Sequence, residues 1–440
     1  MKLIPLLTLV PIALLSFGAE LSPAMVQTTG SVPKVKSFEQ WCRQKKSLPT
    51  ATRNTIEVLL TEAGTKNCKV ADRNLNNFDK LIIIYYGEKI SDLRPLASLN
   101  KLTGLSIMGQ NISDLSPLSG LTNLTYLDLS SNKISDIRAL AGLTSLTKIQ
   151  LSENKLVDIS PLANFSKLTR LSFDRNQVSD LQPLANLTKL NDISAGNNKI
   201  IDLKPLSNLT NLQHLQLNSN QVSDISPLPK LTNLSGLYLI NNQISDIQDL
   251  FGLTNLSILY LSNNRISNIQ PLANSTKLVD LWLADNGSIS DIQALNNLDN
   301  LRVLSLSGNK ISNLKPLTEL INLTTLSLND NQISDLQPLN KLIKMTSLTL
   351  DKNRISDVQP LAKMVNLRGL SLGDNLISDV KPLAGLHKLN VLYLSNNQIS
   401  DIQSLTGLTD LYYGIWLDGN NIKKKRCPLK RGTFCHLERY

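Results

Sequence analysis

The chain has 440 residues, an ordinary apolar content of 41%, few aromatic residues (4%) and a formal net charge of +10. The length allows about three domains, and the charge alone would suggest an anionic partner. The excess of Lys and Arg lies in residues 31–80 and 423–440, whereas residues 81–422 carry 27 basic and 28 acidic side chains. This distribution excludes a long basic groove, so we expect no nucleic-acid partner.

The first residues have the pattern of a secretory signal. Lys2 precedes an apolar stretch at residues 3–17, and small residues follow it. Ser22 and Ala24 suit cleavage after Ala24, within a range of 18–24. The stretch is short for a membrane-spanning helix and contains two prolines, so we expect no transmembrane anchor. We predict a signal peptide at residues 1–24 and a mature chain that is secreted or periplasmic, in the cell envelope.

Four cysteines flank the middle of the chain, two before it and two after it. An even number of cysteines in an exported chain, placed as local pairs, indicates disulfide bonds. We predict the pairs Cys42–Cys68 and Cys427–Cys435. A metal site is the alternative, but the sequence has no CxxC motif or histidine cluster to support it. We therefore expect no metal and no cofactor.

From Leu102 the sequence repeats every 22 residues as L-x-x-L-x-L-x-x-N-x-I-S-D-[IL]-x-P-L-x-x-L-x-x, which is the leucine-rich-repeat signature. The L-x-L segment predicts a short strand whose leucines point inward, and stacked neighbours must complete the core. The asparagine after each strand predicts a buried amide ladder between turns. Asp, Ser and Pro in "SDISPL" predict a turn that leads into a short helical segment.

With these motifs, the chain resembles the internalin-like leucine-rich-repeat proteins of bacteria, through "LTNLTYLDLSSNKISDI" and "LTNLQHLQLNSNQVSDISPL". The resemblance implies an α/β fold: a curved solenoid with parallel strands on the concave face and short helical or 3-10 turns on the convex face. The segment before the repeats is similar to helical caps of secreted bacterial repeat proteins, including cyanobacterial ones. Its "TIEVLLTEAG" predicts a helix that ends at Gly64. We transfer no particular receptor from the family.

These observations divide the chain into four segments. We predict the signal peptide at 1–24, a linker and helical cap at 25–79, a solenoid of about 15 units at 80–422, and a cysteine-containing C-terminal cap at 423–440. Within the last units, four aromatic residues adjoin this cap and are expected to seal the end of the solenoid: Tyr393, Tyr412, Tyr413 and Trp416. The basic run that begins at Lys423 is expected to be a solvated cap surface.

The position between the two core leucines of each strand should face outward, and most repeats place a small polar residue there. Three consecutive repeats place Tyr238, Tyr260 and Trp282 there instead. Contiguous exposed aromatic residues with a polar rim are typical of interaction sites. The residues expected at the edges of this surface are Ile240, Ile258, His214, Asp280 and Asp285. The alternative is that strands simply tolerate aromatic residues, which stack across neighbouring strands, and that the repeat was duplicated.

The sequence shows no nucleophile elbow, phosphate loop or HExxH motif, so we expect no enzyme. The main prediction is an exported recognition scaffold, expected to be a monomer, that binds a protein or peptide on its concave face. A glycan-binding envelope module is the first alternative, because stacked aromatic residues also suit sugars. A structural envelope protein without a dedicated ligand is the second.

Overall fold

The computed structural model describes residues 35–84, 89–423, 427, 429 and 434–437. Contacts divide the chain into two units, Met1–Val35 and Lys36–Tyr440. The predicted signal peptide and most of the linker that follows it lie outside the described residues, as does most of the basic run of the C-terminal cap. The description below concerns the second unit.

In the described residues, three α-helices precede the repeats, and the sequence predicted the longest of them. The Cys42–Cys68 disulfide joins the first helix to the third, with their Cα atoms 5.6 Å apart. The second helix ends just before Gly64, whose φ of 68° is the left-handed conformation that commonly terminates a helix. The helices are α1 (Phe38–Arg43), α2 (Thr50–Glu62) and α3 (Cys68–Leu75).

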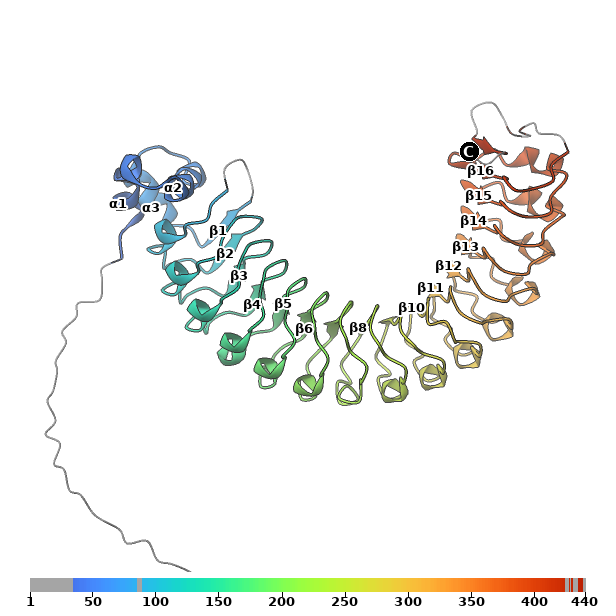
Figure 1. Ribbon diagram of the computed structural model, residues 1–440, viewed down its shortest axis with the longest axis horizontal. Coiled ribbons are helices and arrows are strands. Elements are labelled where there is room, and N and C mark those ends of the chain that lie inside the picture. The colour runs from blue at the N-terminus through green and yellow to red at the C-terminus, as the bar shows by residue number, and fades with distance from the viewer. Residues whose placement is uncertain (1–34, 85–88, 424–426, 428, 430–433, 438–440) are drawn as a thin grey trace, which may run out of the picture. The chain divides into compact units, whose positions relative to one another are not determined.

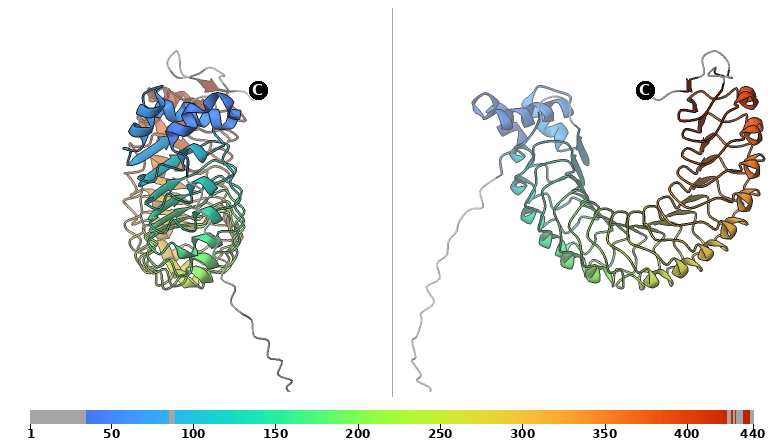
Figure 2. Two further views of the ribbon diagram at one scale, coloured as in Figure 1. Left: turned by 90° about the vertical axis from the view of Figure 1, so that its left-hand side faces the viewer. Right: turned by 45° about the vertical axis from the view of Figure 1, so that its right-hand side comes forward.

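Within the described ranges, a single sheet of 17 parallel strands runs through the repeats, and each strand pairs with the next one along the chain. In the unit Lys36–Tyr440 the strands lie on the inner side of an arc (Figures 1 and 2). The curved leucine-rich-repeat solenoid is thereby confirmed. The strands are β1 (Lys80–Ile83), β2 (Gly104–Ile107), β3 (Tyr126–Asp128), β4 (Lys148–Gln150), β5 (Arg170–Ser172), β6 (Asp192–Ser194), β7 (His214–Gln216), β8 (Gly236–Tyr238), β9 (Ile258–Tyr260), β10 (Asp280–Trp282), β11 (Val303–Ser305), β12 (Thr325–Ser327), β13 (Ser347–Thr349), β14 (Gly369–Ser371), β15 (Val391–Tyr393), β16 (Gly414–Trp416) and β17 (Cys435–His436).

Short 3-10 helices lie on the outer side of the arc, and the predicted aspartates introduce them (Figure 2). Asp114, for example, accepts a hydrogen bond from the backbone N–H of Ser116 at 2.9 Å. One repeat differs: residues 226–228 form only a turn. Pro229 follows there and lacks the N–H that closes the 3-10 turn in other repeats. The 3-10 helices of the repeats are Arg94–Leu96, Ser116–Leu118, Arg138–Leu140, Ser160–Asn164, Gln182–Leu184, Lys204–Leu206, Gln248–Leu250, Gln270–Leu272, Gln293–Leu295, Lys315–Leu317, Gln337–Leu339, Gln359–Leu361, Lys381–Gly385 and Gln403–Gly407; one more, Lys45–Ser47, follows α1.

The alternation along each strand places the core as predicted. Leu237 and Leu239 are fully buried, whereas Tyr238 between them points outward and is partly exposed. Each buried leucine contributes about 1.5–3 kcal/mol through loss of contact with water. The asparagine ladder is also present. The Asn242 amide accepts from the Val222 N–H at 3.0 Å and donates to carbonyl groups of its own and the preceding turn.

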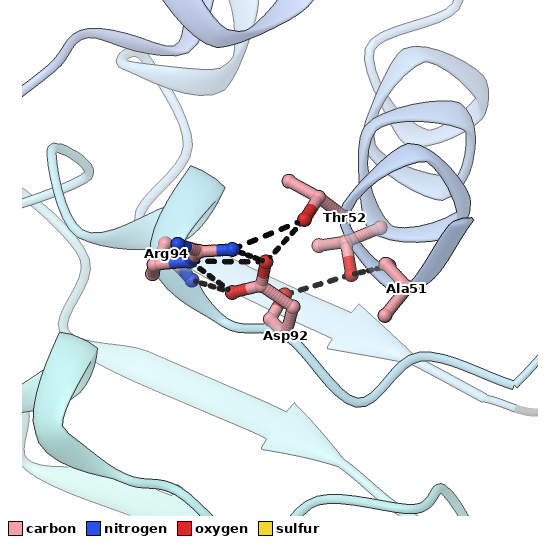
Figure 3. Close-up of polar contacts among 5 residues, drawn as sticks. Ala51, Thr52, Asp92 and Arg94 are labelled. Atoms are coloured by element: carbon pink, nitrogen blue, oxygen red, sulfur yellow. Dashed lines mark hydrogen bonds and ion pairs between the residues drawn. The ribbon is translucent and has the colours of Figure 1, made fainter. Parts of the chain in front are cut away.

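The helical cap contacts the first repeat through a partly buried polar cluster (Figure 3). The Thr52 hydroxyl donates to Asp92 Oδ2 at 2.5 Å, and Arg94 donates to both oxygens of the same carboxylate. The Thr55 hydroxyl donates to the Asp92 carbonyl at 2.8 Å. Burial opposes ionisation of Asp92, but hydrogen bonds from Arg94 and Thr52 outweigh it and lower its pKa. The cluster therefore stabilises the contact while Asp92 is ionised.

The C-terminal cap adds the last strand, β17, to the sheet, and the predicted Cys427–Cys435 disulfide lies there with a Cα–Cα distance of 5.9 Å. The Trp416 ring stacks between Tyr393 and His436, with ring centroids 4.4 and 4.8 Å apart. Trp416 therefore packs onto His436 of the last strand, and Tyr393 packs onto Trp416. Tyr412 and Tyr413 are exposed, and their part in sealing the solenoid stays a prediction.

Candidate functional site

The common register of the strands aligns the outward residues into columns across the inner face. Tyr238 is paired with Tyr260, and Tyr260 with Trp282. Small or amide side chains continue the same column on either side, with Gln216 before Tyr238 and Ser305 after Trp282. We call Tyr238, Tyr260 and Trp282 the aromatic strip.

The three rings of the strip are in direct contact. Tyr260 and Trp282 are stacked, with centroids 4.5 Å apart and ring planes 21° from parallel. Tyr238 and Tyr260 meet edge to face, with centroids 5.1 Å apart and planes at 90°. Such pairs contribute about 0.5–1.5 kcal/mol beyond the burial of their area. Trp282 is nevertheless 37% exposed, so the strip is both ordered and accessible.

A carboxylate lies against the strip. Asp280 begins the strand that carries Trp282, and its Oδ2 accepts a hydrogen bond from the Tyr260 hydroxyl at 2.7 Å. Its Oδ1 is covered and has no hydrogen-bond partner among the described residues. Burial, the hydrogen bond to Asp280 and the charge of Asp280 together raise the pKa of Tyr260 well above its usual value. Tyr260 therefore remains a neutral hydrogen-bond donor.

The Tyr238 ring is placed by a glycine. A Cβ atom on Gly236 would lie 3.1 Å from Tyr238 Cε2 and 2.9 Å from His214 Cδ2. The ring therefore folds back along its own strand and occupies the space that a side chain at position 236 would take. Burial raises the pKa of Tyr238, and the negative charges of Asp280 and Asp192 add to this effect.

The other predicted residues lie at different distances from the strip. His214, Gly236, Ile258 and Asp280 follow one another in a single column across strands β7–β10. Gly236 therefore lies between His214 and Ile258. Ile240 lies two residues beyond Tyr238, where its N–H donates to Asn218. Asp285 does not join the strip. Its φ is 55° and its carboxylate lies over Gly308 of the next repeat, as an added Cβ there would come within 2.2 Å of Asp285 Oδ1.

Sequence reasoning missed a polar depression on strands β4–β6. It has a volume of about 240 Å³, and its lining includes Lys148, Arg170 and Asp192. The Lys148 ammonium also lies 5.2 Å from the centre of the Tyr126 ring. The sequence could have indicated this depression, because Lys148, Arg170 and Asp192 occupy the first outward position of their strands, two residues before the position that holds the aromatic strip in later repeats.

The described residues contain no group of three or more His, Cys, Asp or Glu side chains that could hold a metal ion. None of the helices in the described ranges has the length and apolarity needed to cross a membrane.

Comparison with known proteins places the chain in a family. The model described as Leucine Rich repeats (2 copies) matches residues 122–164 and, in overlapping copies, 188–407. The internalin InlF of Listeria monocytogenes is 34% identical, with 79% of this chain and 94% of that chain covered and a TM-score of 0.63. No curated protein sequence matches the chain significantly.

Two other solved structures widen this set of relatives. A leucine-rich-repeat protein of Leptospira interrogans is 25% identical, with 81% of this chain and 88% of that chain covered and a TM-score of 0.63. The plant peptide hormone receptor RGFR1, solved in complex with RGF2, is 25% identical, with 78% of this chain and 59% of that chain covered and a TM-score of 0.67. From the repeat matches and the similarity to InlF, the chain belongs to the leucine-rich-repeat proteins and, among them, to the internalin-like group.

Proposed function

We propose that the chain is a recognition scaffold without catalytic activity, and that it binds a protein or peptide through the aromatic strip. One observation carries the proposal: three aromatic side chains, each in contact with the next, remain accessible in the middle of the sheet, between Gln216 and Ser305 of the same column. Tyr and Trp are the residues that most often supply the binding energy of protein interfaces. Ile240 and Ile258 are both half-buried and extend the apolar surface on either side of the strip.

The relatives support a polypeptide ligand. RGFR1 was solved with the peptide hormone RGF2, and the structure of PEPR1 carries AtPEP1. The ring geometry points in the same direction. Sugars stack on open aromatic faces, but Tyr260 and Trp282 largely cover one face of each other. A side chain inserted against the strip uses the ring edges and the remaining faces, so we favour a polypeptide over a glycan.

An exported chain is part of the proposal. Disulfides form and persist in oxidising compartments, and this chain has one at each end of its repeats. A secretory signal at residues 1–24 would deliver it to such a compartment. N-terminal sequencing of the mature protein tests this, and retention of residues 1–24 would contradict it.

Selection of peptides tests the binding surface. Peptides of 12 residues would be selected from a random displayed library against the whole chain, synthesised, and titrated by fluorescence anisotropy. Replacement of Tyr238, Tyr260 and Trp282 by Ser should weaken binding at least 30-fold, because the loss of a strong interface anchor costs about 2 kcal/mol or more. The matched control is Tyr412→Ser with Tyr413→Ser, which removes two exposed tyrosines elsewhere.

Each outcome has a distinct meaning. Equal affinity of the triple variant and the wild type would contradict the proposal, provided that circular dichroism shows both to be folded. Binding to a glycan array without any selected peptide would favour the glycan-binding alternative. Failure of both searches would favour a structural protein without a dedicated ligand.

A further inference from the structure

The inner face has a local charge pattern that the net charge of the chain hides. On strands β6–β10, the outward positions within the strands include only two fully charged side chains, Asp192 and Asp280, and both are acidic. His214 is the one titratable base among them. Along the column of outward strand residues that contains Asp192 and Asp280, the next cationic side chains are Arg170 and Lys148, on β5 and β4. The aromatic strip therefore lies in an acidic zone of the strand face.

Two rings of the strip form a corner within this zone. Tyr238 and Tyr260 are in contact with their planes perpendicular, so one ring makes a floor and the other a wall. Asp280 is fixed beside the wall by the hydrogen bond from the Tyr260 hydroxyl. Its second oxygen, Oδ1, receives no donor from the described residues, but it is covered and out of reach of a ligand. The corner therefore offers two aromatic surfaces and, beside them, the negative charge of an acidic side chain.

We propose that this corner receives an arginine side chain of the partner; this inference rests on the proposed function and specifies the chemistry of its ligand. A cation beside the faces of Tyr or Trp is attracted by the negative charge of the ring faces. A guanidinium is planar and weakly hydrated, so it can stack on one ring while its positive charge is attracted by Asp280. An acidic side chain would be repelled by Asp192 and Asp280, and an apolar one would leave these two negative charges without a cationic counterpart.

Lysine is the closest competitor, and the geometry favours arginine over it. An ammonium is a compact, strongly hydrated charge that loses more hydration on entering an aromatic corner. It also cannot match the planar surface of a ring. We therefore expect the peptides selected against the wild-type chain to be enriched in arginine more than in lysine.

Labelled homopolymers test the inference without a known partner. Fluorescein-labelled hexa-arginine, hexalysine and hexaglutamate would be titrated against the whole chain by anisotropy at about 0.15 M ionic strength, which screens long-range attraction. Hexa-arginine should bind about fivefold more tightly than hexalysine, and hexaglutamate should not compete with it. The net positive charge of the chain opposes both cationic probes, so binding would report a local site.

Point variants locate the site. Asp280→Asn removes the charge while keeping an acceptor for the Tyr260 hydroxyl, and Tyr238→Ser removes the floor of the corner. Each should weaken hexa-arginine about fivefold or more. The matched control is Asp246→Asn. Asp246 accepts from a backbone N–H in a turn where Asn268 does the same one repeat later, so this change removes one charge and preserves the turn.

The results separate this inference from the proposed function. If Asp280→Asn binds hexa-arginine as the wild type does, or if hexa-arginine binds no better than hexalysine, the arginine assignment is wrong. In that case, selected peptides that still lose affinity in the triple Ser variant would leave the proposed function intact. If the triple variant also retains those peptides, both are wrong.

Discussion

Removal of one rung of the asparagine ladder should destabilise the solenoid more than any nearby surface change. Asn242 is buried, and its amide joins two turns. In an Asn242→Ala variant the Val222 N–H loses the acceptor that it has at 3.0 Å and remains buried. An orphaned buried donor of this kind costs about 1–3 kcal/mol.

The carbonyl groups of the same rung lose less. Asn242 Nδ2 donates to Leu217 O at 3.0 Å and to Leu239 O at 3.1 Å. Each carbonyl keeps a second amide donor, since Asn220 also donates to Leu217 O and Asn264 to Leu239 O. These two bonds therefore contribute only their net value, about 1 kcal/mol each. The sum is a loss of about 3–5 kcal/mol in the free energy of unfolding.

Urea denaturation followed by circular dichroism measures this loss. Because each repeat contacts only its neighbours, a weakened rung in the middle should also broaden or split the transition. The control is Gln243→Ala, the next residue in the same turn, which is exposed and should change stability by less than about 0.5 kcal/mol. A loss below about 1 kcal/mol for Asn242→Ala, or one equal to that of the control, would contradict a stabilising role of the ladder.

Three further predictions concern the cap and the strip. Replacing Cys42 and Cys68 by Ser removes a cross-link between residues 26 apart and should cost about 3 kcal/mol, seen as a lower thermal midpoint that reducing agent shifts less than it shifts the wild-type midpoint. Folding lowers the pKa of Asp92 from its ordinary 3.8, so Asp92 contributes to folding stability above that pH, and this contribution is lost as the pH falls through the lower folded-state pKa. The difference in urea midpoint between the wild type and Asp92→Asn should therefore shrink from pH 7 to pH 3. A difference that stays constant would contradict this prediction. Gly236→Ala should displace the Tyr238 ring and weaken selected peptides while changing stability by less than about 1 kcal/mol; unchanged affinity would argue against the ring position as a determinant of binding.

The features of the fold that could be predicted from the sequence are those that the 22-residue repeat determines. A 22-residue period with fixed leucines dictates which side chains enter the core, and it correctly placed Leu237, Leu239 and the Asn242 ladder. It failed only where a local residue overrides the period, as at Pro229, which prevents the 3-10 turn. The period also put the three aromatic residues in one column, because that requires only register.

The chemistry of the site depends on side-chain torsions, which a period does not specify. Tyr238 folds over Gly236 because that position lacks a Cβ atom, and Asp280 is held by a hydroxyl from the preceding strand. Asp285 is adjacent in sequence to the strip, but its left-handed backbone directs it to the next repeat. Of these features, only the position of the Tyr238 ring could have been predicted from the sequence, because Gly236 lies two residues before Tyr238 on the same face of the strand.

The alternation of each strand also has a consequence for how such a protein can change over generations. The leucines and the ladder asparagine of a repeat maintain the fold, whereas the outward residue between the leucines belongs to a separate set of positions. If these positions form the binding surface that we propose, a single codon change at one of them would alter the ligand without loss of the scaffold. Under this proposal, recognition would evolve one repeat at a time while the core of every repeat stays the same.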